Sequence, residues 1–397
     1  MRYEVGRFHR PMRRSTESQL ASLVSLGDGS TITIDFSTMS STADLTSRGF
    51  TFGRGSIGTR INANGFVETM SNNVARFDYD PITRAPRGII IEASAANLCC
   101  WSETFATSGG VNNWADSNIT RNSTTNTDPA NGTTALRITA SAPNATILNN
   151  HALSSASRTF SIWLRRVSGT GDIQATLNGG TTWTTQAITS SWVRYEFTAA
   201  TTAHVGIRIV SNSDSIELWG AQTETGGVSS TYIPTSASTV TRSADDCTMT
   251  GTAFSNWFSA SQSQGTIFVS GSRNGTGGIG RLVSINDNSA TNLIDVSLGG
   301  SGRFQITSLG VSQALVTAGS VSRNVEYRQA ATFEQFYAQL AINGALGTAV
   351  TPGMTFIPLN RLMIGKNAAA AYMNGRVKLF KFWPYRLADT TLQSITT

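Results

Sequence analysis

The chain has 397 residues, of which 39% are hydrophobic and 14% charged, and its net charge is +6. This composition is too apolar for a wholly disordered chain and too polar for a membrane protein. Ser and Thr supply 100 residues, and together with Val, Ile and aromatic residues between Gly, Asn and Ser clusters they indicate short strands and tight turns. We therefore expect an all-β protein built from several sandwich-like modules, at about 100–200 residues per domain.

Residues 1–34 are predicted to be a basic arm followed by a short helix. The arm carries five arginines within its first 14 residues: Arg2, Arg7, Arg10, Arg13 and Arg14. Residues 16–26 show the apolar stripe of an amphipathic helix, formed by Leu20, Leu23 and Val24. Because a helix this short is marginal alone, we expect the arm and helix to be held by another chain and to serve as an anchor.

The distribution of charge and hydropathy argues against two kinds of partner. A nucleic-acid binder spreads positive charge along a groove, whereas here it is concentrated in the arm, so no nucleic-acid partner is expected. No apolar run approaches the ~20 residues of a membrane-spanning helix, and residues 1–20 lack the apolar core of a signal peptide. We expect no membrane insertion, synthesis in a cytoplasm and release by a route such as lysis.

Residues 35–97 are predicted to form a β-rich module of their own. The preceding run TITIDF (31–36) alternates with the period of a strand. Asn64-Gly65 stands between two short strand-like segments, which is a strong signal for a β-hairpin. The run RGIIIE (87–92) has the pattern of a buried strand closed by charges.

The remaining chain is predicted to contain two sandwiches joined by a linker. Strand-like runs across 98–235 recur at about 10–15 residues, which suits a jelly roll. Residues 236–246 are Ser/Thr-rich and are predicted to be the linker. Residues 247–397 form the second sandwich, with a last short helix near 389–395. The odd number of cysteines argues against a disulfide framework, and we interpret them as small buried side chains: Cys99, Cys100 and Cys247.

Several strings in the chain resemble those of a known class of proteins. RFDYDP (76–81), RGIIIE (87–92), ELWGAQTETG (217–226) and SSTYIPTSASTVTRSAD (229–245) are similar to a recurring module of bacteriophage tail, fibre and other virion-appendage proteins. NGRVKLFKFWPYRLADTTLQSIT (374–396) resembles the end of a concanavalin A-like (laminin G-like) domain in the same proteins. The resemblance covers about 51–397 and implies a carbohydrate-binding-like jelly roll followed by a concanavalin A-like sandwich.

The resemblance implies a phage fibre or spike protein in the virion, anchored by its N-terminus to other virion proteins. Such a protein binds a host cell-surface polysaccharide through its sandwich loops and forms a homo-oligomer, with a trimer favoured. The alternative is a purely structural virion protein: a head decoration, a head fibre or a tail adaptor. A capsule depolymerase is the third possibility.

The sequence lacks the usual marks of an enzyme. It contains neither the E-x-D-x-x-E string of concanavalin-like glycanases nor a G-x-S-x-G nucleophile elbow. Asp78 and Asp80 have the spacing of a carboxylate pair, but we interpret them as structural partners of Arg76, Arg84 or Arg87. We therefore expect no catalytic residues and a non-enzymatic protein.

Calcium is the only cofactor that the sequence raises. Loop Asp and Asn oxygens are the ligands Ca²⁺ prefers, which makes Asp287 and Asp295 candidate ligands, although a polar turn between strands is the favoured explanation for them. Otherwise we expect no cofactor or metal.

Two tryptophans are the candidate glycan-binding residues. Trp114 and Trp183 lie in polar, turn-rich stretches, where an exposed indole could stack on the apolar face of a sugar. Asn113 and Gln186 are the predicted hydrogen-bonding partners beside them. The alternative for both tryptophans is a place in a hydrophobic core.

Overall fold

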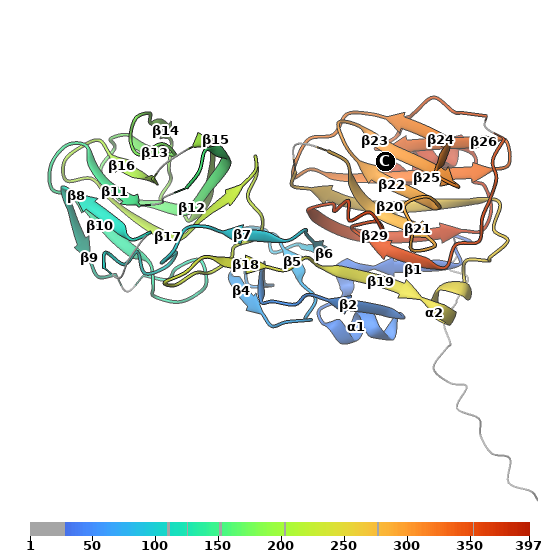
Figure 1. Cartoon of the computed structure of the whole chain (residues 1–397), viewed down its shortest axis with the longest axis horizontal. Helices are drawn as coiled ribbons and strands as arrows, with labels where there is room; N and C mark the ends of the chain where they lie inside the picture. The colour runs from blue at the N-terminus through green and yellow to red at the C-terminus, as the bar shows by residue number, and fades with distance from the viewer. Residues whose placement is uncertain are drawn as a thin grey trace, which may run out of the picture.

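The computed structural model describes most of the chain, namely residues 28–108, 112–124, 126–150, 153–201, 204–275, 278–351 and 353–397. The predicted arm and the 16–26 helix, with their arginines and apolar stripe, lie outside these residues. The described chain forms antiparallel sheets grouped in two lobes (Figure 1). The prediction of an all-β protein with tandem sandwiches is confirmed.

The first lobe, here called the inserted sandwich, consists of two five-stranded sheets. One sheet has the order β15 (Val193–Thr201), β12 (Ala156–Ser168), β17 (Ser215–Thr225), β10 (Leu136–Ala140) and β9 (Ile119–Asn122). The other has the order β14 (Thr184–Gln186), β13 (Ile173–Thr176), β16 (Val205–Ile209), β11 (Ala145–Asn149) and β8 (Trp114–Ser117). Aliphatic and aromatic residues that alternate along these strands meet between the sheets in one core.

The second lobe, here called the split sandwich, packs an eight-stranded sheet on a seven-stranded one. The larger sheet has the order β27 (Ala345–Leu346), β26 (Tyr337–Ile342), β25 (Glu326–Glu334), β20 (Gly265–Arg273), β29 (Gly375–Trp383), β6 (Pro86–Ile91) and β5 (Phe77–Tyr79), and β1 (Ile32–Asp35) also pairs with β29. The smaller has the order β2 (Phe50–Gly53), β19 (Asp246–Thr250), β28 (Arg361–Ile364), β21 (Gly280–Asn286), β22 (Leu293–Leu298), β23 (Gly302–Ser308) and β24 (Val311–Ala318). Their facing side chains form the largest buried cluster of the described chain.

The split sandwich is assembled from two distant parts of the sequence, which differs from the predicted module at 35–97. Strands β1 and β6 pair with different halves of β29, and β2 pairs with β19. The inserted sandwich begins and ends at an antiparallel pair, β7 (Ala95–Asn97) with β18 (Val240–Arg242). The predicted linker at 236–246 therefore contains a paired strand. The strand pattern at 35–97 did not show this, because local alternation carries no information about distant partners.

The remaining elements are short. The predicted hairpin around Asn64-Gly65 is confirmed as β3 (Gly58–Ile61) and β4 (Val67–Met70). The helical elements are η1 (Phe36–Thr38), α1 (Thr42–Ser47), α2 (Gly251–Ser255) and α3 (Asp389–Thr396). The described part of the chain holds no helix with the length and apolar character needed to cross a bilayer.

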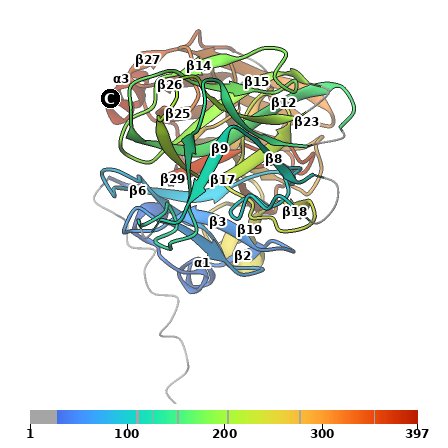
Figure 2. The same cartoon turned by 90° about the vertical axis from the view of Figure 1, so that its left-hand side faces the viewer.

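Direct contacts join the two sandwiches as well. Arg323, on the loop before β25, forms an ion pair with Glu196 of β15 at 2.7 Å. Asn274 donates from Nδ2 to the backbone oxygen of Ser229 at 2.6 Å. Viewed from the side of the inserted sandwich, the split sandwich lies directly behind it, with α1 and β2 below (Figure 2). The two sandwiches thus form one elongated body (Figure 1).

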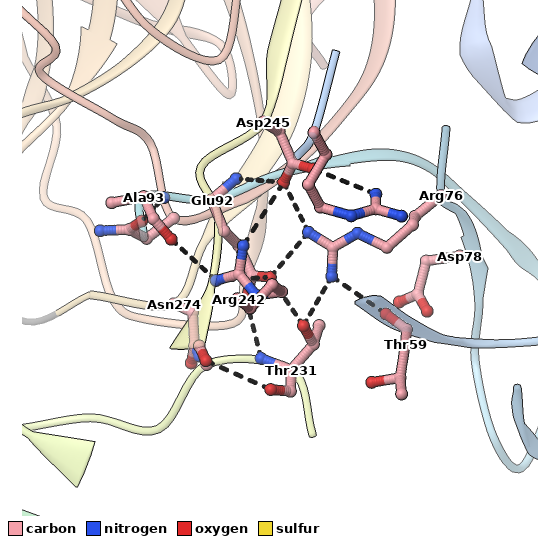
Figure 3. A network of polar contacts seen from close by, with 12 residues as sticks. Thr59, Arg76, Asp78, Glu92, Ala93, Thr231, Arg242, Asp245 and Asn274 are labelled. Atoms are coloured by element: carbon pink, nitrogen blue, oxygen red, sulfur yellow. Dashed lines mark hydrogen bonds and ion pairs between the residues drawn. The ribbon is translucent and has the colours of Figure 1, made fainter. Parts of the chain in front are cut away.

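A cluster of buried charged side chains, here called the junction network, lies where the chain enters and leaves the inserted sandwich: Arg54, Arg76, Arg242, Glu92 and Asp245. Figure 3 shows Arg76, Arg242, Glu92 and Asp245 of this network. Arg76 donates to Glu92 at 2.9 Å and to Asp245 at 2.5 Å. The backbone N–H of Thr231, which follows β17, donates to Glu92 at 2.9 Å. Burial alone would raise the pKa of Glu92, but the arginines Arg242 and Arg76 and the Thr231 hydrogen bonds hold it well below its usual value.

Three of the strings behind the family resemblance supply residues to this network. Arg76 comes from RFDYDP, Glu92 from RGIIIE, and Thr231 and Asp245 from the string at 229–245. A buried ion pair that loses one partner costs about 3–5 kcal/mol, so these residue types depend on one another. These three strings therefore help to connect the two sandwiches.

Candidate functional site

Trp114 is a core residue, so the prediction that it is an exposed platform is wrong. Its side chain is 1% exposed and packs on Phe105, with ring centroids 4.8 Å apart. Its Nε1 donates to the backbone oxygen of Cys100 at 3.2 Å. A polar sequence around a tryptophan is compatible with burial here, because neighbouring residues of β8 point to solvent while the indole points inward. The adjacent Asn113 is half-buried beside this core position.

Trp183 lies at the opposite edge of the same sheet, just before β14, and is half-buried. The guanidinium carbon of Arg208 lies 4.3 Å from the centroid of its ring. Gly180, at φ +88°, lets the preceding turn approach the indole, because a Cβ there would lie 3.1 Å from Cζ2 of Trp183. The Gly-Gly turn that the sequence singled out thus positions this ring.

Gln186 lies on the other face of β14 from the tryptophan. It pairs with the buried Ile173, and its side-chain nitrogen donates to the backbone oxygen of Ala187 at 3.0 Å. Side chains alternate along a strand, so Trp183 shares a face with Thr185 and not with Gln186. The predicted pairing of Trp183 with Gln186 in one site is therefore not what the structure shows.

A row of polar side chains runs across the outer face of this sheet beside Trp183. It is here called the Arg208 row, and its members are opposite one another on five adjacent strands: Thr185, Gln174, Arg208, Thr146 and Ser117. The residues on either side of them in β13, β16 and β11 are buried, so these five face outward. Gln174 donates to Thr185 at 3.0 Å and accepts from Nε of Arg208 at 2.8 Å.

This face combines an aromatic ring with hydroxyl, amide and guanidinium groups. Apolar sugar faces stack on aromatic carbon, and sugar hydroxyls need donors and acceptors, so the chemistry suits a saccharide. The ring contact and the two hydrogen bonds from Arg208 to Gln174 hold the guanidinium in place before any ligand arrives. Sequence reasoning missed Gln174 and Arg208. The alternation in IQAT (173–176) and VGIRI (205–209) indicates that both face outward, but not that they are neighbours.

The other sheet of the inserted sandwich carries a similar stack with different electrostatics. Arg165 lies 4.8 Å from the ring of Trp192, but it is paired at 2.5 Å with Glu217, which Arg137 also contacts. Burial would raise the pKa of Glu217, but hydrogen bonds from Asn126, Thr124 and the two arginines lower it to about 2. Arg165 therefore has a carboxylate partner within the protein, whereas the described contacts of Arg208 include none.

A separate cavity of about 410 Å³ lies between α3 and the eight-stranded sheet. Its floor includes Phe268, and its rim carries charges of both signs. Lys381 is paired with Asp28 at 2.6 Å and Lys378 with Glu326 at 3.1 Å. These four charges pair with one another. Two further charged residues line the cavity: Arg328, which donates to the backbone oxygen of Thr397 at 2.7 Å, and Asp35, which accepts from the backbone N–H of Ser37 at 2.9 Å.

Asp78 and Asp80, the carboxylates with the spacing of a catalytic pair, both bond to structural partners. Asp78 accepts from the backbone N–H of Ile61 at 2.8 Å and from Arg376 at 2.5 Å. Asp80 accepts from the N–H groups of a tight turn and from Arg87, as the sequence suggested.

The two candidate calcium ligands likewise bond to other groups of the protein. Asp287 accepts from Ser289 and Asn292 within its own turn, while Asp295 is buried against Arg281 at 2.5 Å. Across the residues that the structure describes, no three His, Cys, Asp or Glu side chains gather as a metal site. The three cysteines are buried and unpaired by disulfides, as predicted.

Comparison with known proteins gives likenesses of shape alone. No protein-family model matches the sequence, and no curated protein matches it. Similar solved structures include the Ruminococcus gnavus IT-sialidase CBM40, at 15% identity and a TM-score of 0.31, covering 35% of this chain and 85% of that one. The leech intramolecular trans-sialidase shows 16% identity and a TM-score of 0.30, covering 34% of this chain and 24% of that one. The receptor-binding domain of botulinum neurotoxin type G shows 12% identity and a TM-score of 0.29, covering 38% of this chain and 40% of that one. No functional argument rests on likenesses of this size.

Proposed function

We propose that this chain is a non-enzymatic bacteriophage virion-appendage protein that binds a host-surface glycan through the inserted sandwich. The virion role is supported by the strings at 51–105, 217–245 and 374–396, which resemble those of phage appendage proteins. Attachment to other virion proteins is proposed for residues 1–34, and a homo-oligomer, with a trimer favoured, for the assembled protein.

The observation that carries the glycan-binding role is the stack of Arg208 on Trp183 beside the Arg208 row. The ring is half-buried, so part of it meets solvent, and Thr185 and Ser117 are exposed. A flat, polar face with one ordered aromatic residue suits a long polysaccharide, which passes over a surface instead of entering a closed pocket.

A glycan array probed with the purified chain and with Trp183→Ala tests this function. We expect the wild-type chain to bind at least one class of bacterial surface polysaccharide and the variant to lose most of that binding. Trp183 is not a core residue, so the melting temperature of the Trp183→Ala variant should differ little from that of the wild-type chain. Trp192→Ala serves as the matched control, because it removes a stacked tryptophan from the opposite sheet.

The outcomes separate the proposed function from its alternatives. Equal binding by the wild-type chain and Trp183→Ala would place the glycan elsewhere on the molecule. The absence of any glycan binding would favour a structural virion protein, such as a head decoration, head fibre or tail adaptor. Release of reducing ends from a bound polysaccharide would favour a depolymerase.

A further inference from the structure

We infer that the glycan recognised by the Arg208 row is anionic, with carboxylate-bearing sugar residues such as uronates. This inference rests on the proposed glycan-binding function and names the class of ligand. It is argued from the charge of the row, from the geometry of its arginine and from the contrast with the opposite sheet.

The charge of the row is unmatched. Among its five members Arg208 is the only ionisable group, and the other four are Thr185, Gln174, Thr146 and Ser117. The hydrogen bonds of Arg208 go to the neutral amide oxygen of Gln174. An outward-facing cation with an uncharged protein partner favours a ligand that brings the negative charge itself.

The geometry of Arg208 suits a carboxylate. Its plane is held by the Trp183 ring at 4.3 Å and by Gln174, which accepts from Nε and Nη2. Arginine binds carboxylates through its planar array of donors, and an arginine that is already ordered loses less side-chain entropy on binding. The hydroxyls of Thr146 and Ser117 continue the row on the other side of Arg208, where they can contact the hydroxyls of the same sugar chain.

The opposite sheet provides an internal comparison. Arg165 stacks on Trp192 in the same way, yet it is paired with the buried Glu217, a carboxylate that it shares with Arg137. The inserted sandwich presents three arginine–tryptophan stacks: Arg165 on Trp192, Arg194 on Trp163 and Arg208 on Trp183. Arg165 is paired with Glu217, and Arg194 lies in the electrostatic field of Glu224 and Glu196, whereas no carboxylate stands among the described contacts of Arg208. We assign the anionic ligand to the Arg208 stack for this reason.

Isothermal titration calorimetry with the full chain tests the inference. The probes are oligosaccharides of alginate, hyaluronan and polygalacturonate, with dextran oligosaccharides of equal length as the neutral comparison. We expect at least one uronate polymer to bind at least tenfold more tightly than dextran, and its affinity to fall as salt rises. Arg208→Gln should weaken that binding about tenfold to a hundredfold, the size of a charge-assisted hydrogen bond, and should weaken dextran binding by a clearly smaller factor.

The control for loss of charge is Arg361→Gln, which removes a half-buried arginine hydrogen-bonded to Asn288 on the split sandwich. It should bind the uronate polymer as the wild-type chain does. An unchanged melting temperature verifies that Arg208→Gln is folded.

The possible results distinguish the two proposals. If dextran and the uronates bind equally and Arg208→Gln matches the wild-type chain, the anionic class is wrong, while loss of binding in Trp183→Ala would still support the glycan site. If none of the uronates binds but a neutral glycan does, the inference also fails and the proposed function stands. If no glycan binds at all, both fail.

Discussion

Replacing Asp245 by Asn should destabilise the protein far more than the same change at the next residue. Asp245 is fully buried, and Arg54 and Arg76 donate to it at 3.3 and 2.5 Å. The substitution keeps the size of the side chain and leaves three buried arginines facing one carboxylate. Breaking a buried ion pair in this way costs about 3–5 kcal/mol. At about 2–4 °C per kcal/mol for a unit of this size, the melting temperature should fall by about 6–20 °C.

Asp246→Asn is the matched control. The Asp246 side chain is 52% exposed and pairs with Lys366 at 2.6 Å. Surface pairs contribute about 0–1 kcal/mol, so the control should shift the melting temperature by less than about 4 °C. Differential scanning calorimetry of the two variants and the wild-type chain at neutral pH provides the measurement. Equal, small shifts in both variants would show that the junction network does not hold the sandwiches together.

Three further predictions concern burial, pH and chemistry. Trp114→Ala should lower stability by about 3–5 kcal/mol in chemical denaturation, because it empties a core position, whereas Trp183→Ala should stay within about 1 kcal/mol. The pKa of Glu217 is about 2 in the folded chain, against an ordinary value of 4.5. The stability that ionised Glu217 contributes is therefore complete above pH 4.5 and is lost as the pH falls towards 2. Thermal melts across this pH range should show the decline in melting temperature, and a melting temperature that does not change with pH would contradict this prediction. Incubation with host polysaccharide should release no reducing ends, and hydrolysis abolished by joint Asp78→Asn and Asp80→Asn changes would overturn the non-enzymatic assignment.

The local signals in the sequence predicted individual strands well. The predicted strands at 31–36 and 87–92 correspond to β1 and β6, and the predicted Asn64-Gly65 turn joins β3 and β4. Alternation and turn residues are properties of a few neighbouring residues, so they are visible in one sequence.

The pairing of distant segments was not accessible in the same way. Nothing in TITIDF (31–36) shows that β1 pairs with β29, some 350 residues later along the chain. The same limit applies to the candidate site, because Gln174 and Arg208 become neighbours only through the register of β13 and β16. Composition around Trp114 suggested exposure, but one strand can present polar residues to solvent and an indole to the core.

A crystal structure of the chain with a bound uronate oligosaccharide would test the central claim most directly. The account predicts a sugar ring on Trp183, its carboxylate within hydrogen-bonding distance of the Arg208 guanidinium, and hydroxyls near Thr185 or Thr146. A sugar bound instead in the cavity between α3 and the eight-stranded sheet, with the Arg208 row uncovered, would contradict it.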